Sequence, residues 1–330
     1  MNQMNKVETK QWKRVVKRIC ISIVCFIILF LLIVPSIIVF QATQNRVDYK
    51  GYATADYPLQ DIYTASDFNL EANEITLLTE DGYELWVSEV LTEQPKAVII
   101  YLSGIRQPSV TYFYGHAKWM RNNGYASFLL EVRGHGNSDG DRVCLGYEEV
   151  SDVMAVVDYI KGQEKYKKVP IVLHGVSMGG AIAINSFGQI KEIDGLIAMS
   201  AYSSFEDVVC DTMGNYNIPR FVREIEKYLV RLWLQFVFGN KVNEITPIKQ
   251  VENIGERPAL FVASKLDTEV PPENMERLLN KAPDHSKSWL RNSDSSGHFI
   301  IKDKNFLDIE QDTEYCDRIL TFLEANIVNR

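Results

Sequence analysis

The chain has 330 residues, of which 46% are hydrophobic and 24% are charged, so it can bury a full core and is not of disordered composition. Its net charge of −8 argues against nucleic acid as a partner, because nucleic-acid-binding proteins present basic surfaces. The five cysteines are scattered, which excludes a disulfide scaffold, and no cysteine–histidine cluster has the spacing of a zinc site.

The first 40 residues combine a basic tail, residues 1–18, with an apolar run, Ile19–Phe40, that carries no charge. At a helical rise of about 1.5 Å per residue the run spans roughly 33 Å, which matches the hydrocarbon thickness of a bilayer. We therefore expect an uncleaved membrane-spanning signal anchor over residues 19–40, with a cleaved signal peptide as the alternative. The positive charges before the run predict a single-pass protein with a cytoplasmic N-terminus and an exported large domain.

Residues 41–71 are polar and are expected to form a spacer, and residues 72–330 are expected to form one folded domain. The sequence contains no Asn-x-Ser/Thr acceptor for glycosylation, which mildly favours a bacterial cell membrane as its location.

Strand-like and helix-like segments alternate along the expected domain. It begins with a hairpin of Glu74–Thr79 and Tyr83–Leu91 around the Asp-Gly turn at 81–82. Further strands are expected at 97–102, 126–132, 170–173, 193–199, 258–263 and 287–290, and helices at 115–123, 146–161, 177–190 and 316–328. Such alternation implies parallel strands with right-handed crossovers. The predicted fold class is therefore α/β, with a mostly parallel, doubly wound sheet that places ligands at the carboxyl ends of its strands.

The most informative motif is Gly-Val-Ser-Met-Gly at residues 175–179, which directly follows an expected strand and opens an expected helix. The pattern is typical of a nucleophile elbow, in which the serine, here Ser177, stands in a strained conformation at the apex of a sharp turn. Gly175 and Gly179 lack the Cβ atoms that would collide with backbone at such a turn. An ordinary glycine-rich turn is the alternative.

This elbow resembles that of the α/β-hydrolase superfamily, and within it the branch of the serine aminopeptidases (S33) and monoacylglycerol-lipase-like enzymes. Residues 131–138, Glu-Val-Arg-Gly-His-Gly-Asn-Ser, are similar to a stretch that follows the fourth strand in that branch, and Gly124-Tyr125 precedes the strand. The resemblance covers about residues 72–328. It implies an α/β-hydrolase fold with a helical cap and an esterase- or lipase-like serine hydrolase that needs no cofactor and no metal.

A serine hydroxyl is weakly nucleophilic and needs a base within hydrogen-bonding reach. His298, just after the last expected strand, lies where this fold presents its base. The other four histidines are expected in structural or surface positions: His174 beside the serine, His135 in the Arg-Gly-His-Gly turn, and His116 and His285 on the surface.

The base in turn needs a carboxylate that holds one tautomer and stabilises its charged form. Asp267 follows the expected strand at 258–263 and resembles the acid of the family, where Asp precedes Val-Pro by a few residues; Glu269 is the second candidate. The order Ser177, Asp267, His298 is that of the α/β-hydrolase triad.

The developing oxyanion needs hydrogen-bond donors that are placed in advance. One is expected to be the backbone N–H of Met178, directly after the nucleophile. The family resemblance points to the N–H of Ile105 as the other, although this chain has Ser103-Gly104 where the family usually has His-Gly.

Residues 202–250 lie between two expected strands and are too long for a simple loop. Their apolar residues have the spacing of an amphipathic helix: Phe221, Val222, Ile225, Leu229, Trp233, Leu234, Phe236 and Phe238. The segment is therefore expected to be a cap over the active site. Its apolar residues would either favour acyl or aromatic substrates or only pack the cap onto the core.

Together these features predict a membrane-anchored hydrolase that cleaves carboxylic esters or thioesters of a small acyl substrate through an acyl-enzyme. A peptidase or amidase with the same triad is the first alternative, because elbow and triad are common to both. A catalytically silent binding module tethered to the membrane is the second.

Overall fold

The computed structural model describes residues 2–43, 46–47, 58–292, 295 and 297–329. The strands are β1 Ala72–Leu78, β2 Glu84–Val90, β3 Val98–Leu102, β4 Ala126–Leu130, β5 Ile171–Val176, β6 Gly195–Met199, β7 Ala259–Ser264 and β8 Lys287–Arg291. The helices are α1 Asn2–Thr43, α2 Tyr114–Asn122, α3 Val150–Gly162, α4 Met178–Gln189, α5 Phe205–Gly214, α6 Arg220–Phe238, α7 Lys241–Glu244, α8 Pro247–Gln250, α9 Glu273–Leu279 and α10 Thr313–Leu323. A π-helical turn, Glu324–Val328, continues α10.

The strands form one eight-stranded sheet in the order β1-β2-β4-β3-β5-β6-β7-β8. The hairpin β1–β2 and the pair β2–β4 are antiparallel, and every pair from β4 to β8 is parallel. Parallel strands joined by helices on both faces are the doubly wound arrangement expected from the alternating pattern. The predicted fold class is confirmed, and β3, β5 and β6, with α4, form its centre.

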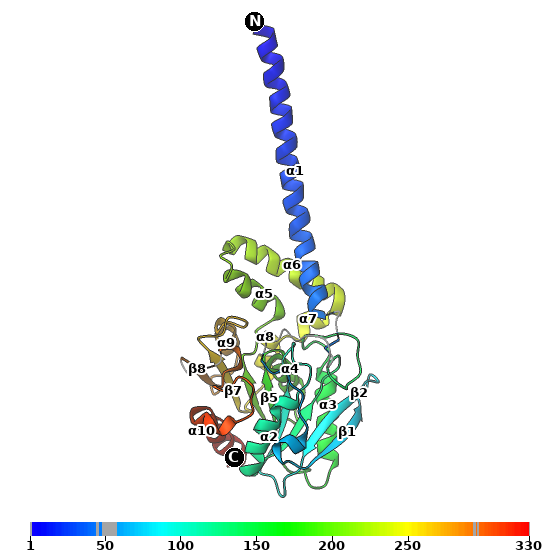
Figure 1. Cartoon of the computed structure of the whole chain (residues 1–330), viewed down its shortest axis with the longest axis vertical. Helices are drawn as coiled ribbons and strands as arrows, with labels where there is room; N and C mark the ends of the chain where they lie inside the picture. The colour runs from blue at the N-terminus through cyan, green and yellow to red at the C-terminus, as the bar shows by residue number, and fades with distance from the viewer. Residues whose placement is uncertain (1, 44–45, 48–57, 293–294, 296, 330) are drawn as a thin grey trace.

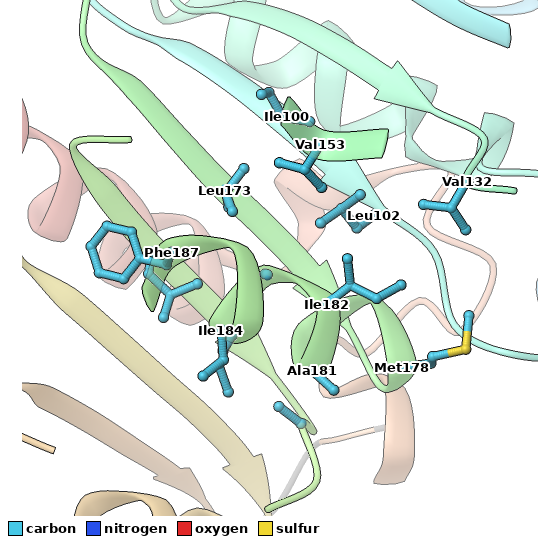
Figure 2. Packing of buried hydrophobic residues seen from close by; sticks show 14 of the residues in the cluster. Ile100, Leu102, Val132, Val153, Leu173, Met178, Ala181, Ile182, Ile184 and Phe187 are labelled. Carbon is cyan, nitrogen blue, oxygen red and sulfur yellow. The ribbon is translucent and has the colours of Figure 1, made fainter. Parts of the chain in front are cut away.

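The middle of the sheet is covered on both faces, and every residue of β3, β5 and β6 is buried. Helix α4 is buried along almost its whole length and packs against β5 and β6. Figure 2 shows the apolar side chains of this region interdigitating between α4, α3 and the sheet: Ile100, Leu102, Val132, Val153, Leu173, Met178, Ala181, Ile182, Ile184 and Phe187. Such packing holds the start of α4 in a fixed place.

Most elements lie within about three residues of the expected bounds, and two differ more clearly. Helix α3 begins at Val150 rather than at residue 146, because the Glu149 carboxylate accepts a hydrogen bond from the backbone N–H of Gly146 (2.8 Å) and closes a turn there. Gly146 itself has a φ of +90°, which a helix does not allow. Helix α9 was not expected, since its seven residues are too short for a clear periodicity.

The predicted cap segment, residues 202–250, contains α5, α6, α7 and α8 between β6 and β7. Figure 1 shows α5 and α6 standing above the carboxyl ends of the strands, with α6 crossing the lower end of α1. Helix α1 is long and apolar enough to cross a membrane. It projects away from the domain as a single rod (Figure 1).

Parts of the expected spacer, residues 44–45 and 48–57, lie outside the described residues. Arg46 and Val47 between them are fastened to the domain. The Arg46 guanidinium donates hydrogen bonds to the carbonyls of Gly140 (2.8 Å) and Gly136 (2.5 Å). Val47 pairs as an isolated β-bridge with His135. The end of α1 is therefore held close to the loop that follows β4.

Candidate active site

Ser177 stands at the sharp bend between β5 and α4. Its φ of 57° and ψ of −121° are unfavourable for a residue with a side chain, and its backbone N–H donates to the Met199 carbonyl (2.9 Å). A Cβ on Gly175 would lie 2.1 Å from the Gly179 carbonyl oxygen, and one on Gly179 would lie 2.2 Å from that of Leu102. The bend therefore requires both elbow glycines, and packed backbone holds the serine in its strained conformation.

His298 lies in the short helical turn Gly297–Phe299 after β8, and its ring is buried. Its Nδ1 lies 2.9 Å from Oδ2 of Asp267. The other carboxylate oxygen of Asp267 accepts the backbone N–H groups of Glu269 and Val270, each at 2.9 Å. These two contacts fix the carboxylate, which in turn fixes the ring, so that Nδ1 carries the proton and Nε2 is free to act as a base.

The surroundings of His298 act on its pKa in opposite directions. Burial lowers the pKa, whereas the charge of Asp267 and its hydrogen bond raise it, with a smaller contribution from Glu269. Arg106 acts against them. The net pKa lies above the ordinary value of 6.5, so the site favours the charged imidazolium that forms when a base takes a proton.

The expectation that His116 lies on the surface is wrong, because its side chain is fully buried. Its ring packs edge-on against Phe113 and its Nε2 lies 3.1 Å from the Tyr315 hydroxyl. The sequence around His116 did not reveal this environment, because part of it comes from Tyr315, nearly 200 positions later. His174 is buried beside it, and burial lowers the pKa of His174 to about 3.

His135 is buried and its ring contacts the backbone, as expected of a structural residue. Its Nδ1 and Nε2 lie 3.3 and 3.4 Å from the carbonyls of Arg133 and Ile105, respectively. Burial lowers its pKa to about 4, so the ring is neutral and donates to one of these carbonyls at a time. His285 is half-buried, and its Nε2 lies 3.2 Å from the Arg257 carbonyl.

The two segments expected to bind an oxyanion lie on either side of Ser177. Met178 is the first residue of α4, so its N–H is among those that the helix leaves without a partner. The turn with Ile105 comes close to the serine, since a Cβ on Gly104 would lie 3.3 Å from the Cβ of Ser177. Ile105 is half-buried and lines the same cavity as the serine.

A cavity of about 1200 Å³ opens over the serine and contains both Ser177 and His298 in its lining. Within the described residues no hydrogen bond joins these two side chains, which is common in enzymes without substrate. Glu269, the second candidate for the acid, lines the cavity and pairs with Arg106 at 3.8 Å, whereas Asp267 holds the histidine.

Sequence reasoning missed a large part of this lining. Three residues from the end of α1, Ile38, Gln41 and Ala42, contribute to the cavity, as do residues of α5: Phe205, Val208, Val209, Thr212 and Met213. Helix α6 contributes none, so its apolar residues do not face the serine. No sequence pattern indicates that this apolar N-terminal helix also borders a pocket, because that contact is set by tertiary packing.

No group of three or more His, Cys, Asp or Glu side chains that could hold a metal ion occurs within the described ranges. The carboxylates near the serine have other partners: Asp267 is bonded to His298, and Glu269 pairs with Arg106.

Comparisons with known proteins agree with this fold. The sequence model of the family described as "Serine aminopeptidase, S33" matches residues 93–254. Protein bem46 of Schizosaccharomyces pombe is 26% identical over 246 residues, which cover 69% of this chain and 73% of bem46. The chain has the α/β-hydrolase fold, and residues 93–254 are similar in sequence to this serine aminopeptidase family.

Two further relatives of this α/β-hydrolase are informative. An uncharacterized membrane protein of Saccharomyces cerevisiae is 23% identical over 273 residues, which cover 82% of this chain and 88% of the yeast protein. A solved esterase of Pyrococcus furiosus superposes with a TM-score of 0.61 at 20% identity, covering 84% of this chain and all of that chain. The esterase likeness concerns the fold. The family match and these relatives together support a hydrolase.

Proposed function

We propose that the chain is a membrane-anchored serine hydrolase that cleaves carboxylic ester or thioester bonds of an acyl substrate through an acyl-enzyme. The observation that carries the proposal is a buried His298, held by Asp267 at 2.9 Å, lining one cavity with a strained Ser177. This is the constellation that nucleophilic catalysis by a serine requires.

In the proposed reaction, Oγ of Ser177 attacks the carbonyl carbon while Nε2 of His298 takes the hydroxyl proton. Asp267 accepts the Nδ1–H bond and stabilises the imidazolium. The backbone N–H groups of Met178 and Ile105 bind the oxyanion, and each such donor is worth about 3–4 kcal/mol of barrier.

The tetrahedral intermediate collapses, the ester carbon–oxygen or carbon–sulfur bond breaks, and His298 gives its proton to the leaving alcohol or thiol. His298 then takes a proton from water, which attacks the acyl carbon. Collapse releases the carboxylic acid and returns the proton to Ser177. Every proton is passed through one imidazole, so the chemistry needs no cofactor.

We also infer that residues 19–40 cross the membrane with the N-terminus in the cytoplasm and the catalytic domain on the other side. The support is the length and apolar character of α1, the basic residues before it and the membrane relative in yeast. Protease protection of an N-terminal tag in closed vesicles tests this orientation. The tag is expected to be digested when the protease is added to the cytoplasmic face of the membrane, and to be protected when it is added to the opposite face.

A fluorophosphonate probe tests whether Ser177 is a reactive nucleophile. The wild-type chain is expected to be labelled, and Ser177→Ala is expected to lose the label while keeping its thermal unfolding temperature. A folded wild-type protein without Ser177-dependent labelling would instead favour a silent binding module tethered to the membrane.

The family description as a serine aminopeptidase favours a peptidase or amidase as the second candidate. Hydrolysis of p-nitrophenyl acyl esters against aminoacyl p-nitroanilides distinguishes the two activities. The esterase is supported if the ratio of ester to anilide turnover by the enzyme is larger than the ratio of the uncatalysed hydrolysis rates of the two substrates. Efficient cleavage of the anilides supports the peptidase.

A further inference from the structure

Helix α6 has two apolar faces, although only one is needed to pack it onto the domain. Val230, Leu234 and Phe238 are buried on the inner face. The outer face carries a second stripe whose members are exposed and repeat mainly every three or four residues: Phe221, Ile225, Tyr228, Leu232, Trp233 and Phe236. We call these six residues the outer stripe.

The outer stripe is a concentration of exposed apolar surface. Outside α1, six of the twelve exposed large apolar side chains in the described part of the chain lie on it. Phe221 and Phe236 at its two ends are 70% and 82% exposed. A contiguous apolar patch of this kind in a protein marks a surface that contacts a partner or a membrane.

The position of helix α1 indicates that the surface contacted by the outer stripe is the membrane. The end of α1 packs against α6, and Val39 is part of the main hydrophobic core. The chain beyond α1 is clamped to the domain by Arg46 and Val47. Helix α6 therefore keeps a fixed position beside the segment of α1 that enters the membrane.

Helix lengths give the depth of this contact. The basic residues Lys17 and Arg18 mark the inner end of the apolar run, and about 20 residues are needed to cross the hydrocarbon. The span must therefore reach almost to Phe40. From Leu31 onward one side of the helix is covered: Leu31 and Val34 are half-buried, and Pro35 and Val39 are buried. At about 1.5 Å per residue, the stretch from Leu31 to Phe40 measures roughly 14 Å, so the cap beside it lies at the level of the outer leaflet.

The cavity reaches the same level. Ile38, Gln41 and Ala42 of α1 form part of its wall, and so does the exposed Tyr216 in the loop between α5 and α6. The cavity is thus bordered, on its way from Ser177 to the surface, by the helix that crosses the bilayer.

We propose that the outer stripe of α6 inserts into the leaflet crossed by α1, and that the end of α1 forms one wall of an entrance through which bilayer-resident amphipathic acyl esters reach Ser177. The proposal names the substrate class of the proposed hydrolase and rests on it and on the proposed anchor. Aromatic residues such as Tyr228 and Trp233 suit the interface, where an apolar ring meets polar head groups.

Tryptophan fluorescence tests the membrane contact. Full-length chain with Phe236→Trp is reconstituted in vesicles of phosphatidylcholine brominated near the top of the acyl chains, and the wild-type signal is subtracted. Leu78→Trp, at an exposed site on β1, is the matched control. Bromine is expected to quench the tryptophan at 236 at least about twice as strongly as that at 78, because quenching requires contact with the chains. Equal quenching would overturn the proposal.

Hydrolysis rates test the entrance. The readout is the rate on a long-chain ester embedded in vesicles divided by the rate on a soluble short-chain ester. Double substitution Phe221→Ser/Phe236→Ser is expected to lower this ratio about tenfold, since the two rings contribute buried apolar area in the leaflet. Leu78→Ser is expected to leave it within about twofold, as for an ordinary surface site. An unchanged ratio in the double variant, or an equal loss on both esters, would overturn the proposal.

Failure of the proposed hydrolase would look different. In that case Ser177-dependent turnover is missing for the soluble ester as well, whereas quenching of the tryptophan at 236 still reports whether α6 contacts the bilayer.

Discussion

The elbow and the cap of this hydrolase were both visible in the sequence as motifs, yet only the elbow could be assigned its contacts. At the elbow, Gly175 and Gly179 lie directly against neighbouring backbone and Ser177 has a positive φ, so the motif and its geometry determine each other. In the cap, the apolar period of α6 predicted a helix but fitted two faces equally well. Motifs whose constraint is local can be interpreted from sequence, whereas amphipathic patterns need the tertiary neighbours.

The largest expected difference between the regions is chemical. Asp267→Asn is expected to lower kcat by about 10³–10⁴-fold, because the imidazole loses the carboxylate that selects its tautomer and stabilises its charge. Glu269→Gln, two residues away on the same loop and paired with Arg106, is the matched control and is expected to cost far less. Steady-state kinetics on a soluble p-nitrophenyl ester measure both. A larger loss of kcat for Glu269→Gln than for Asp267→Asn would show that Glu269, and not Asp267, is the acid of the triad.

Glycine substitutions compare the regions by stability. Gly179→Ala places a Cβ 2.2 Å from the Leu102 carbonyl oxygen and is expected to cost about 1–3 kcal/mol of unfolding free energy or more. Gly214→Ala, at the end of cap helix α5, would meet only the flexible guanidinium of Arg223 at 2.8 Å, so its effect is expected to stay within about 1 kcal/mol. Urea denaturation measures both. Equal losses of unfolding free energy for the two variants would show that the elbow is not more closely packed than the cap.

Narrowing the cavity from the cap side is expected to change the preference for acyl-chain length more than the rate of hydrolysis of short esters. Met213→Trp adds volume to a residue of α5 that lines the cavity. It is expected to lower kcat/KM for long-chain esters about tenfold relative to acetate esters, since the lost apolar contact concerns the acyl chain only. A chain-length series of p-nitrophenyl esters gives this ratio. A uniform loss over all lengths would mean that α5 does not contact the acyl chain.

Electrostatic effects at the rim are expected to be the smallest. A base must be neutral to accept a proton, and the pKa of His298 is raised, so kcat/KM is expected to rise with pH through a midpoint above 6.5. Arg106 lowers this pKa, so Arg106→Gln is expected to move the midpoint to higher pH. Glu269 raises it, so Glu269→Gln is expected to move the midpoint to lower pH. Midpoint shifts of the opposite sign would contradict the assignment of this pH dependence to the ionisation of His298.

Several features of the site could be predicted because a short segment contains the whole constraint. The bend at Ser177 needs glycines at fixed offsets, and Asp267 and His298 each follow a parallel strand, at the edge where such sheets place their ligands. The contacts of His116, Ile38 and Ala42 could not be predicted. His116 is buried by Tyr315, and the other two reach the cavity because α1 packs on α6. Such long-range contacts leave no periodic signal in a single sequence.

The most direct test of the central claim is to trap the covalent intermediate. The full-length protein is mixed rapidly with a p-nitrophenyl acyl ester, quenched in acid within the first turnover and digested, and the acylated peptide is identified by mass spectrometry. We expect one acyl group, on the hydroxyl of Ser177, that accumulates with the first burst of p-nitrophenol. An acyl group on another residue, or steady turnover that leaves Ser177 unmodified throughout, would contradict it.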